Sequence, residues 1–317
     1  MPTRETNPRA VRRVLVIFPG ALGDLVCLMP SLAAIARSHP GASIELMARM
    51  ELAQLAAGRT VVTRAHSIDA REVGALFTDD TSGIARRLFG DFDRIYSFFA
   101  TDDSRFRARL SAATDAHVSF HPFRPAGDGH ISTAYLRSIE TEVDDVASTT
   151  NPRLEPTPND LAAATSALVQ SKCGTSNLLV MFPGSGSPGK NWSANKFVAL
   201  ASELSELASV AVVLGPAEMS LEPAFCAAGV PVLKQLDLPT VAAIAHVASA
   251  FVGNDSGVSH LAAAVGASGV VIFGPTDPAR WRPVAPEGGG QIAVVRRTPI
   301  ETVDVREIAS ILSKFVA

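Results

Sequence analysis

Two segments decide the fold: Val14-Leu15-Val16-Ile17-Phe18-Pro19-Gly20 near the N-terminus and Leu178-Leu179-Val180-Met181-Phe182-Pro183-Gly184 past the middle of the chain. Each is an apolar run typical of a buried parallel strand, and each ends in a glycine loop. A helix is predicted after each loop, over residues 25–38 and 193–207. The two copies therefore indicate two doubly wound α/β halves.

Ligands of such sheets bind at the carboxyl ends of the strands, so two facing halves would place both glycine loops in one cleft. That arrangement suits a transferase with one substrate on each half. The chain has 317 residues, enough for two domains. Residues 151–159 hold three prolines and form the predicted linker, so we expect domains over 1–155 and 156–317. An amphipathic helix over 305–315 is expected to dock across the first half.

Composition excludes several classes of protein. The net charge is −3, so no overall positive field favours nucleic acid or anionic lipid. Cys27, Cys173 and Cys226 lack the spacing of a metal site and are typical of reduced thiols in a cytosolic protein. Pro19 and Asp24 interrupt the apolar run that a signal peptide would need, and no other run reaches the roughly 20 residues of a membrane span.

The first glycine loop, Gly20-Ala21-Leu22-Gly23-Asp24, sets a carboxylate at the start of a helix. One interpretation is that Asp24 only caps this helix. Because the loop lies at the carboxyl edge of the sheet, a role in binding or catalysis is equally open.

The second loop, Gly184-Ser185-Gly186-Ser187-Pro188-Gly189, matches the dinucleotide pattern G-x-G-x-x-G, and Glu218 follows the next strand as a ribose-binding acid would. A nicotinamide enzyme is therefore one candidate. Pro188 and a helix that starts only at Ser193 argue against it. The longer loop instead projects Lys190 toward the backbone amides as a diphosphate clamp, unless this residue is a surface lysine.

A third motif, Gly253-Asn254-Asp255-Ser256-Gly257-Val258-Ser259-His260, joins a short strand to a helix. Asp255 or Ser256 is expected to cap the helix, which leaves the amide of Gly257 for an anion. Ser256 and His260 share one helical face. His260 could be a core histidine, but its place one turn from an anion-binding helix start favours a ligand contact.

Two charged clusters have simpler explanations. Arg105 and Arg109 share one face of a helix, with Arg86 and Arg87 nearby in sequence, and most such clusters are solvated faces. Asp91-Phe92-Asp93 spells the D-x-D motif of metal-dependent glycosyltransferases. Because this motif leads directly into a strand over 94–99, we expect turn chemistry and no metal site.

In combination the motifs are recognisable: the chain resembles the heptosyltransferase-type family of GT-B glycosyltransferases, glycosyltransferase family 9, over nearly its whole length. The matching segments are Leu22-Gly23-Asp24 with Met29-Pro30; Phe182-Pro183-Gly184-Ser185 with Lys190 and Trp192; and Asp255-Ser256-Gly257-Val258-Ser259-His260-Leu261-Ala262 leading into Phe273-Gly274-Pro275-Thr276-Asp277-Pro278. One departure is the apolar first loop, because relatives with strongly acidic acceptors carry basic residues there.

The resemblance implies an acceptor-binding first half and a donor-binding second half. It makes Asp24 the general base and Lys190 the residue that neutralises the donor diphosphate. The remaining implied site residues bind or shape the donor pocket: Ser185, Ser256 and Gly257 at the phosphates, Glu218 at the ribose hydroxyls, and Asp255 and His260 in the pocket wall.

The implied reaction is an inverting, metal-independent transfer of a sugar, heptose from an ADP-heptose donor, to a lipopolysaccharide core or related glycan acceptor. The implied place is the cytoplasm, with peripheral contact to the inner membrane, and neither a cofactor nor nucleic acid is expected. The alternatives are a GT-B transferase that uses another nucleotide sugar, an NAD-dependent oxidoreductase, and a sensor that kept the donor pocket.

Overall fold

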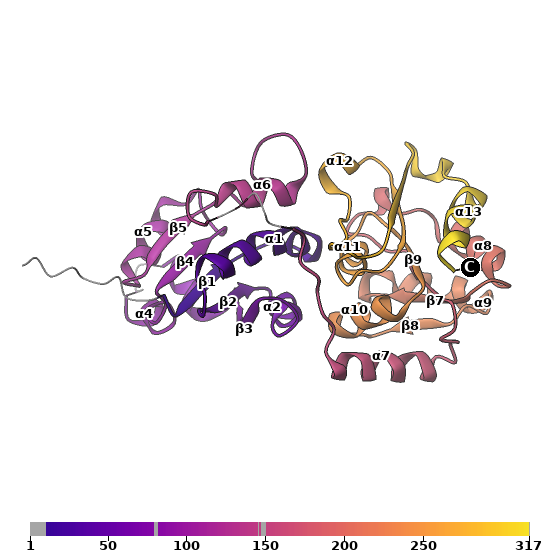
Figure 1. Cartoon of the computed structure of the whole chain (residues 1–317), viewed down its shortest axis with the longest axis horizontal. Coiled ribbons are helices and arrows are strands. Elements are labelled where there is room, and N and C mark those ends of the chain that lie inside the picture. The colour runs from indigo at the N-terminus through magenta and orange to yellow at the C-terminus, as the bar shows by residue number, and fades with distance from the viewer. Residues whose placement is uncertain (1–10, 79–81, 145, 147–149, 317) are drawn as a thin grey trace, which may run out of the picture.

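The two apolar runs form the centres of two parallel sheets in the computed structural model, β1 (Arg13–Ile17) in the first and β6 (Leu178–Phe182) in the second. The structure describes residues 11–78, 82–144, 146 and 150–316. They make two α/β halves that lie side by side, the first in indigo to magenta and the second in orange to yellow (Figure 1).

The first half is a five-stranded sheet in the order β3-β2-β1-β4-β5, in which every pairing is parallel. Its other strands are β2 (Ser43–Ala48), β3 (Val62–Ser67), β4 (Arg94–Ser97) and β5 (His117–Phe120). Its helices are α1 (Leu22–Ser38), α2 (Met50–Ala56), α3 (Arg71–Ala75), α4 (Ser82–Phe89), α5 (Ser104–Ala112) and α6 (Ile131–Ser138).

The second half is a six-stranded parallel sheet in the order β11-β10-β9-β6-β7-β8. Its other strands are β7 (Ser209–Leu214), β8 (Val232–Lys234), β9 (Ala250–Asn254), β10 (Gly269–Phe273) and β11 (Ile292–Arg296). Its helices are α7 (Pro158–Gln170), α8 (Ala194–Leu204), α9 (Glu222–Ala227), α10 (Leu238–Val247), α11 (Gly257–Ala264), α12 (Pro278–Trp281) and α13 (Val305–Val316), with short 3-10 turns η2 (Pro188–Lys190), η3 (Pro216–Leu221) and η4 (Ile300–Thr302).

Each sheet is covered by helices on both faces, which explains why its central strands are apolar throughout. Along β1, Val14 and Val16 pack on the side of α1 and α6, whereas Leu15 and Ile17 pack on the opposite side, against residues of α4 and α5. The strand β6 alternates in the same way between two further cores of the second half. No helix in the described parts of the chain is both long and apolar enough to cross a membrane.

Two expectations about the ends of the second half need correction. The last helix, α13, does not dock on the first half, because its apolar stripe of Ile308, Leu312 and Val316 packs in the core with α8, β9 and β10. The proline-rich linker is also shorter than expected. Pro158 and Asn159 are already helical, since proline fits the first position of a helix, and the side chain of Thr157 caps α7.

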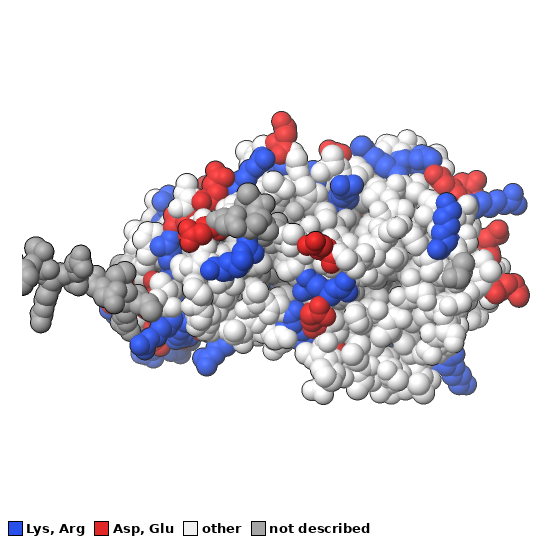
Figure 2. Space-filling model, viewed as in Figure 1, with Lys and Arg blue, Asp and Glu red and all other residues white. Residues whose placement is uncertain are grey.

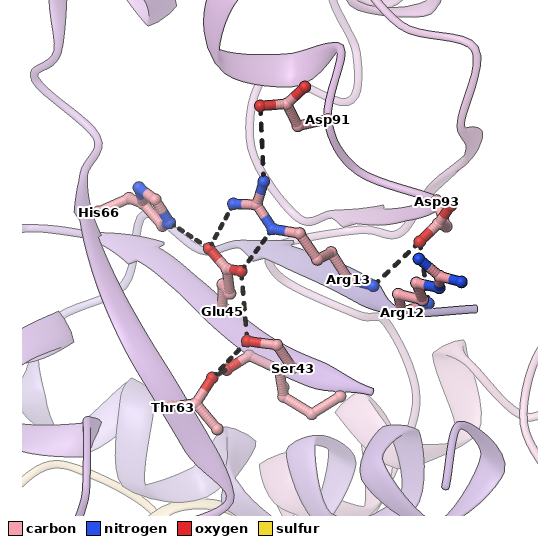
Figure 3. A network of polar contacts seen from close by, with 9 residues as sticks. Arg12, Arg13, Ser43, Glu45, Thr63, His66, Asp91 and Asp93 are labelled. Carbon is pink, nitrogen blue, oxygen red and sulfur yellow. Dashed lines mark hydrogen bonds and ion pairs between the residues drawn. The ribbon is translucent and has the colours of Figure 1, made fainter. Parts of the chain in front are cut away.

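A polar network around the buried Glu45 joins β1, β2 and β3 of the first sheet (Figure 3). The side chain of Glu45 is completely buried on β2 and accepts two hydrogen bonds from Arg13, at 2.8 and 3.0 Å, and one from His66 at 2.6 Å. These hydrogen bonds outweigh burial and hold the pKa of Glu45 below its ordinary value. Asp93 accepts the backbone amides of Arg12 and Arg13 at 2.9 and 3.0 Å.

An ion pair between Arg59 and Asp160 connects the two halves beside the linker. Arg59, which follows α2, donates to Asp160 on α7 through two hydrogen bonds of 2.6 and 2.7 Å, and both side chains are largely buried. The Arg59 guanidinium holds the pKa of Asp160 at about 2. The amide of Glu155 also donates to the carbonyl oxygen of Arg59 at 2.9 Å. Arg59 therefore holds the linker and the start of the second half against the first.

We predict that Arg59→Met lowers the free energy of unfolding by about 3 kcal/mol at neutral pH, because it leaves the buried carboxylate of Asp160 without its cation. Asp160 has its ordinary pKa of 3.8 in the unfolded chain, above its folded value of about 2. The contribution of the pair is thus complete above pH 4 and is lost as the pH falls toward 2. Urea unfolding at pH 7 and pH 3 measures both values.

The matched control is Arg64→Met, because Arg64 is exposed on β3 and should change stability by less than about 0.5 kcal/mol. An Arg59 variant as stable as this control, or equally destabilised at both pH values, would contradict the role of the ion pair.

Candidate active site

The site lies where the strand order reverses in both sheets. In each half the first strand pairs with two neighbours, β1 with β2 and β4, and β6 with β7 and β9, so a crevice opens beyond its carboxyl end. The loops after β1, β6 and β9 are the three glycine-containing motifs of the sequence. They meet where α1 of the first half reaches α11 of the second (Figure 1).

Two glycines allow the helices α1 and α11 to begin almost in contact. A methyl group added at Gly257 would lie 2.8 Å from Cβ of Leu22 and 3.1 Å from the backbone nitrogen of Gly23. One added at Gly23 would lie 3.3 Å from Cδ2 of His260. At Gly257 only glycine fits without moving one helix, whereas a methyl group at Gly23 would require a small shift of the His260 imidazole.

Two adjoining chambers lie on either side of the crossing, with volumes of about 400 and 380 Å³. The first has an apolar wall, formed by Leu22, Phe182, Val213, Leu236, Leu238 and Val258, and contains Glu218. The second is lined by charged and polar residues: Asp24, Arg124, Lys190, Asp255, His260 and Thr276, beside Trp281. Both chambers share Ala21, Gly23, Gly186, Ser256 and Gly257, so they form one continuous cleft.

Asp24 is buried in the first turn of α1 and faces the polar chamber. Its Oδ2 accepts the amide of Ala21 at 3.0 Å, so it does cap its own helix, as the simpler interpretation expects. Its Oδ1 accepts a hydrogen bond of 2.7 Å from Arg124. The carboxylate therefore combines a structural contact with a position at the edge of open space.

Lys190 extends from the turn η2 across the chamber. Its ammonium group lies 2.7 Å from Oδ2 of Asp255, whose side chain is buried while that of Lys190 is about one-third exposed. A partly exposed cation is thus held in place by a buried carboxylate and keeps a free side toward the cleft. The surface-lysine interpretation of Lys190 does not fit this position.

The helix α11 begins without the side-chain cap that the sequence predicted from Asp255 or Ser256. Asp255 pairs with Lys190, and the hydroxyl of Ser256 makes its contact with Ser259 at 3.2 Å, so neither side chain caps the helix. The first amides of a helix have no partner within that helix. The amide of Gly257 lies at this helix start, where a helix can bind an anion.

His260 is neutral and joins the two halves. Burial lowers the pKa of this histidine to about 4. Its Nδ1 lies 3.7 Å from Sγ of Cys27 on α1, and burial raises the pKa of that thiol to about 12. A protonated thiol can donate to a neutral imidazole, so the contact holds α1 against α11 without adding charge.

Glu218 approaches the second glycine loop closely. A methyl group at Gly184 would lie 2.3 Å from Oε1 of Glu218, and one at Gly215 would lie 2.7 Å from its Oε2. The two glycines thus make room for this carboxylate at the ends of β6 and β7. Ser185 lies on the same chamber wall, and its hydroxyl donates to the carbonyl of Ser187 at 2.7 Å.

The G-x-G-x-x-G match is not a dinucleotide site. Its third glycine, Gly189, belongs to the turn η2, and the helix α8 begins five residues later at Ala194. Close packing of the helix start on the strand, which a dinucleotide site requires, is therefore absent from this loop.

The charged clusters lie away from the cleft. Arg105 and Arg109 line a separate hollow beside Phe77, and Arg86 pairs with Asp115. Asp93 binds the backbone at the entrance of β1, as turn chemistry predicts, and Asp91 lies near Arg13. Within the described residues, no group of three histidine, cysteine or acidic side chains could hold a metal ion.

The structure adds three residues that sequence reasoning did not identify. Asn254 accepts the amide of Trp192 at 3.1 Å and donates to the carbonyl of Pro183 at 2.7 Å, which fixes the second loop. Arg124 reaches the polar chamber from a loop without a recognisable motif, and Trp281 reaches it from the end of the short helix α12. Asn254 stood inside the third motif, whereas nothing in the sequence around Arg124 sets it apart.

A hollow of about 590 Å³, larger than either chamber, lies outside the cleft between α8, α9 and the beginning of β7. Its lining residues include Cys173, Ser202, Ser205 and Ser209 and carry no charged side chain. The paired chambers are therefore the candidate site, because carboxylates, a lysine, an arginine and a helix start line them.

Comparison with known proteins places the chain next to one family. The model of glycosyltransferase family 9 (heptosyltransferase) matches residues 133–299, more than half of the chain. A family 9 glycosyl transferase from Veillonella parvula DSM 2008 is similar in structure, with a TM-score of 0.80, 16% identity and coverage of 96% of this chain and 97% of that one. No curated protein sequence gives a significant match.

Two heptosyltransferases from E. coli are also similar. ADP-heptose LPS heptosyltransferase II has a TM-score of 0.76 at 16% identity, over 96% of this chain and 98% of that one. Heptosyltransferase WaaC, solved with ADP, has a TM-score of 0.69 at 18% identity, over 96% and 99%. These similarities confirm the predicted GT-B architecture of two facing doubly wound halves.

We predict that Gly257→Ala destabilises the protein by about 1–3 kcal/mol, since its methyl group forces α1 and α11 apart. Thermal or urea unfolding measures this effect. Gly186→Ala is the matched control, because a methyl group there meets nothing within 4 Å although the residue lines the same cleft. Equal stability of the two variants would show that the crossing is not tightly packed.

Proposed function

Because this chain belongs to glycosyltransferase family 9, the heptosyltransferase family, we propose that it transfers heptose from ADP-heptose to the lipopolysaccharide core or a related glycan. One observation carries the proposal. Within a single chamber, the carboxylate Asp24 from the first half faces the ammonium group of Lys190 and the helix start at Gly257 from the second. A proton acceptor and an anion-binding group thus line the same space of about 380 Å³.

The apolar chamber suits the nucleoside of the donor. Its walls match a purine base, and Glu218 at its rim can accept hydrogen bonds from ribose hydroxyls. The E. coli heptosyltransferase WaaC has been solved with ADP and with ADP-2-deoxy-2-fluoro heptose. The same nucleotide in this chain would place its diphosphate at the residues that both chambers share, Ser256 and Gly257 among them.

The second half would stabilise the leaving diphosphate. As the glycosidic bond breaks, negative charge grows on the phosphate oxygens. Lys190, the amide of Gly257 and the positive end of the α11 dipole are fixed before the reaction and point to this place. Ser185 adds a hydroxyl, and Asp255 keeps Lys190 in position.

The first half would supply the base. Asp24 takes the proton of an acceptor hydroxyl while that oxygen attacks the anomeric carbon, and the nucleoside diphosphate departs with the bonding electrons. Attack from the side of Asp24 and departure on the side of Lys190 describe a single displacement, so the anomeric configuration inverts.

Neither a metal ion nor a cofactor has a step in this scheme. Lys190, backbone amides and a helix dipole replace the charge that a divalent cation supplies in other glycosyltransferases. Asp93 accepts the backbone amides of Arg12 and Arg13 where β1 begins, and Asp91 lies near the guanidinium of Arg13, so both are at the edge of the first sheet opposite to the cleft. The metal-independent reaction proposed here therefore depends on the cations of this chain.

The proposal includes the surroundings of the reaction. A lipopolysaccharide acceptor is attached to the inner membrane, so the enzyme would work in the cytoplasm with peripheral contact to that membrane. Basic and acidic side chains are interspersed on the face drawn in Figure 2, which does not favour a nucleic-acid partner for that face.

The main alternative is that the donor carries another nucleotide. Thermal-shift measurements with ADP, UDP, GDP and CDP separate these candidates, because a ligand at about 100 times its dissociation constant raises the free energy of unfolding by roughly 2.7 kcal/mol.

A pair of variants tests the two catalytic roles. Asp24→Ala should reduce transfer from ADP-heptose by about 100- to 10,000-fold and leave ADP affinity unchanged, because a base is lost and the donor site is not. Lys190→Ala should lose about 10- to 100-fold in both ADP affinity and transfer, because it removes a charged hydrogen bond to the diphosphate. Single-turnover kinetics and calorimetry measure these quantities. Transfer by Asp24→Ala within tenfold of the unaltered enzyme would refute the assignment of the base.

Transfer should persist after metal stripping in excess EDTA, because the fixed charges of the chain already stabilise the leaving group. The measurement compares initial rates before stripping, after stripping, and after addition of magnesium, manganese or iron. If one of these ions restored a lost rate, the leaving-group site described here would be wrong.

A further inference from the structure

Both oxygens of the proposed base are already hydrogen-bonded. Oδ1 of Asp24 accepts from Arg124 at 2.7 Å, and Oδ2 accepts the amide of Ala21 at 3.0 Å with a second, longer contact to Arg124 at 3.4 Å. The bond to Ala21 belongs to the cap of α1. The bond to Arg124 holds the oxygen that a substrate hydroxyl would need.

Arg124 is the exposed partner in its ion pair with the buried Asp24, so an anion in the cleft can reach the guanidinium. Its side chain is 55% exposed, and among the described residues Asp24 is the only polar partner recorded for it. The guanidinium also lies 4.4 Å from the ring centre of Phe123 and 5.4 Å from that of Trp281. These aromatic faces can keep the cation in the chamber when its hydrogen bonds change.

The loop that carries Arg124 is fastened to the other half. Arg280 on α12 donates to the carbonyl oxygens of Pro125, Gly127 and Gly129 at 2.7, 2.8 and 3.1 Å. His130, whose pKa is lowered by burial, lies with Nε2 2.8 Å from the carbonyl oxygen of Arg282. The position of Arg124 is therefore set jointly by both halves, at the chamber where donor and acceptor meet.

Without its ion pair to Arg124, Asp24 could promote hydrolysis of the donor. The polar chamber is wide enough for water, and a free carboxylate beside the anomeric carbon can activate water as readily as an acceptor hydroxyl. The water oxygen would bond to the anomeric carbon, its proton would pass to Asp24, and ADP would leave with the bonding electrons. Hydrolysis of this kind consumes the donor without transfer.

Building on the proposed function, we propose that Arg124 masks Asp24 until an acceptor arrives, and that an anionic group of the acceptor, a carboxylate or a phosphate, draws the guanidinium away and frees the base. Arg124 is then a positioning residue that couples proton abstraction to acceptor binding. It also supplies the basic group that the apolar first loop lacks in sequence.

Other charged and titratable groups face Asp24 from the elements around it. They are Cys27 on its own helix, Tyr135 on α6, His260 on α11 and the Lys190–Asp255 pair across the chamber. Cys27, Tyr135 and His260 are uncharged at neutral pH. Burial raises the pKa of the Cys27 thiol to about 12, raises the pKa of the Tyr135 hydroxyl well above its ordinary value, and lowers the pKa of His260 to about 4. Arg124 is thus the cation in direct contact with the base.

The test measures ADP-heptose hydrolysis without any acceptor. Arg124→Met should increase hydrolysis by at least about tenfold, since general-base catalysis contributes 100-fold or more when unobstructed. Arg124→Lys keeps a cation and should stay near the unaltered rate. In the double variant Arg124→Met with Asp24→Ala the increase should vanish, because the base is gone. Arg306→Met, an exposed arginine on α13, is the control for charge removal.

Added anions test the exchange itself. Inorganic phosphate or acetate should raise hydrolysis by the unaltered enzyme and have no effect on Arg124→Met, with chloride at matched ionic strength as reference. Stimulation by phosphate alone would indicate a phosphorylated acceptor, and stimulation by acetate alone would indicate an acidic sugar.

The outcomes separate this inference from the proposed function. If calorimetry shows no binding of ADP-heptose, both fail. If the donor binds but Arg124→Met hydrolyses it no faster than the unaltered enzyme, or if the increase persists without Asp24, the masking role is wrong while the proposed function stands.

Discussion

The close approach of α1 and α11 at Gly23 and Gly257 is the constraint on which the cleft depends. It brings two helix N-termini together, and each carries a partial positive charge. Two buried carboxylates, Asp24 and Asp255, lie beside these helix starts, and two cations, Arg124 and Lys190, pair with them. The pairs differ in purpose under the proposed mechanism, because Lys190 is held for the donor while Arg124 is held until the acceptor displaces it.

Much of the fold could be predicted because its signals are local. The repeated Phe-Pro-Gly ending marked both central strands, and their continuous apolar character required a sheet covered on both faces. The order of the strands then follows from the doubly wound topology. The sequence also predicted that the motifs around Asp24, Lys190 and Ser256 lie in one cleft. Each motif follows a strand of a parallel sheet, and the carboxyl ends of such strands meet at one edge.

The remaining features depend on contacts between distant segments. The apolar stripe of α13 predicts that this helix docks, but not on which of two similar halves. The sequence predicted that Asp255 or Ser256 caps α11. Only the fold shows that the carboxylate of Asp255 instead accepts a hydrogen bond from Lys190. Arg124 lies 100 residues from Asp24 and carries no local signal. Arg59 likewise meets Asp160 across the boundary between the halves.

The most direct test of this account is a crystal structure with ADP-2-deoxy-2-fluoro heptose, the donor analogue found in the E. coli enzyme. The account predicts adenosine in the apolar chamber near Glu218, the diphosphate in contact with Lys190 and the amide of Gly257, and the anomeric carbon facing Asp24. A nucleotide bound elsewhere, for example in the hollow between α8 and α9, or a sugar turned away from Asp24, would contradict it.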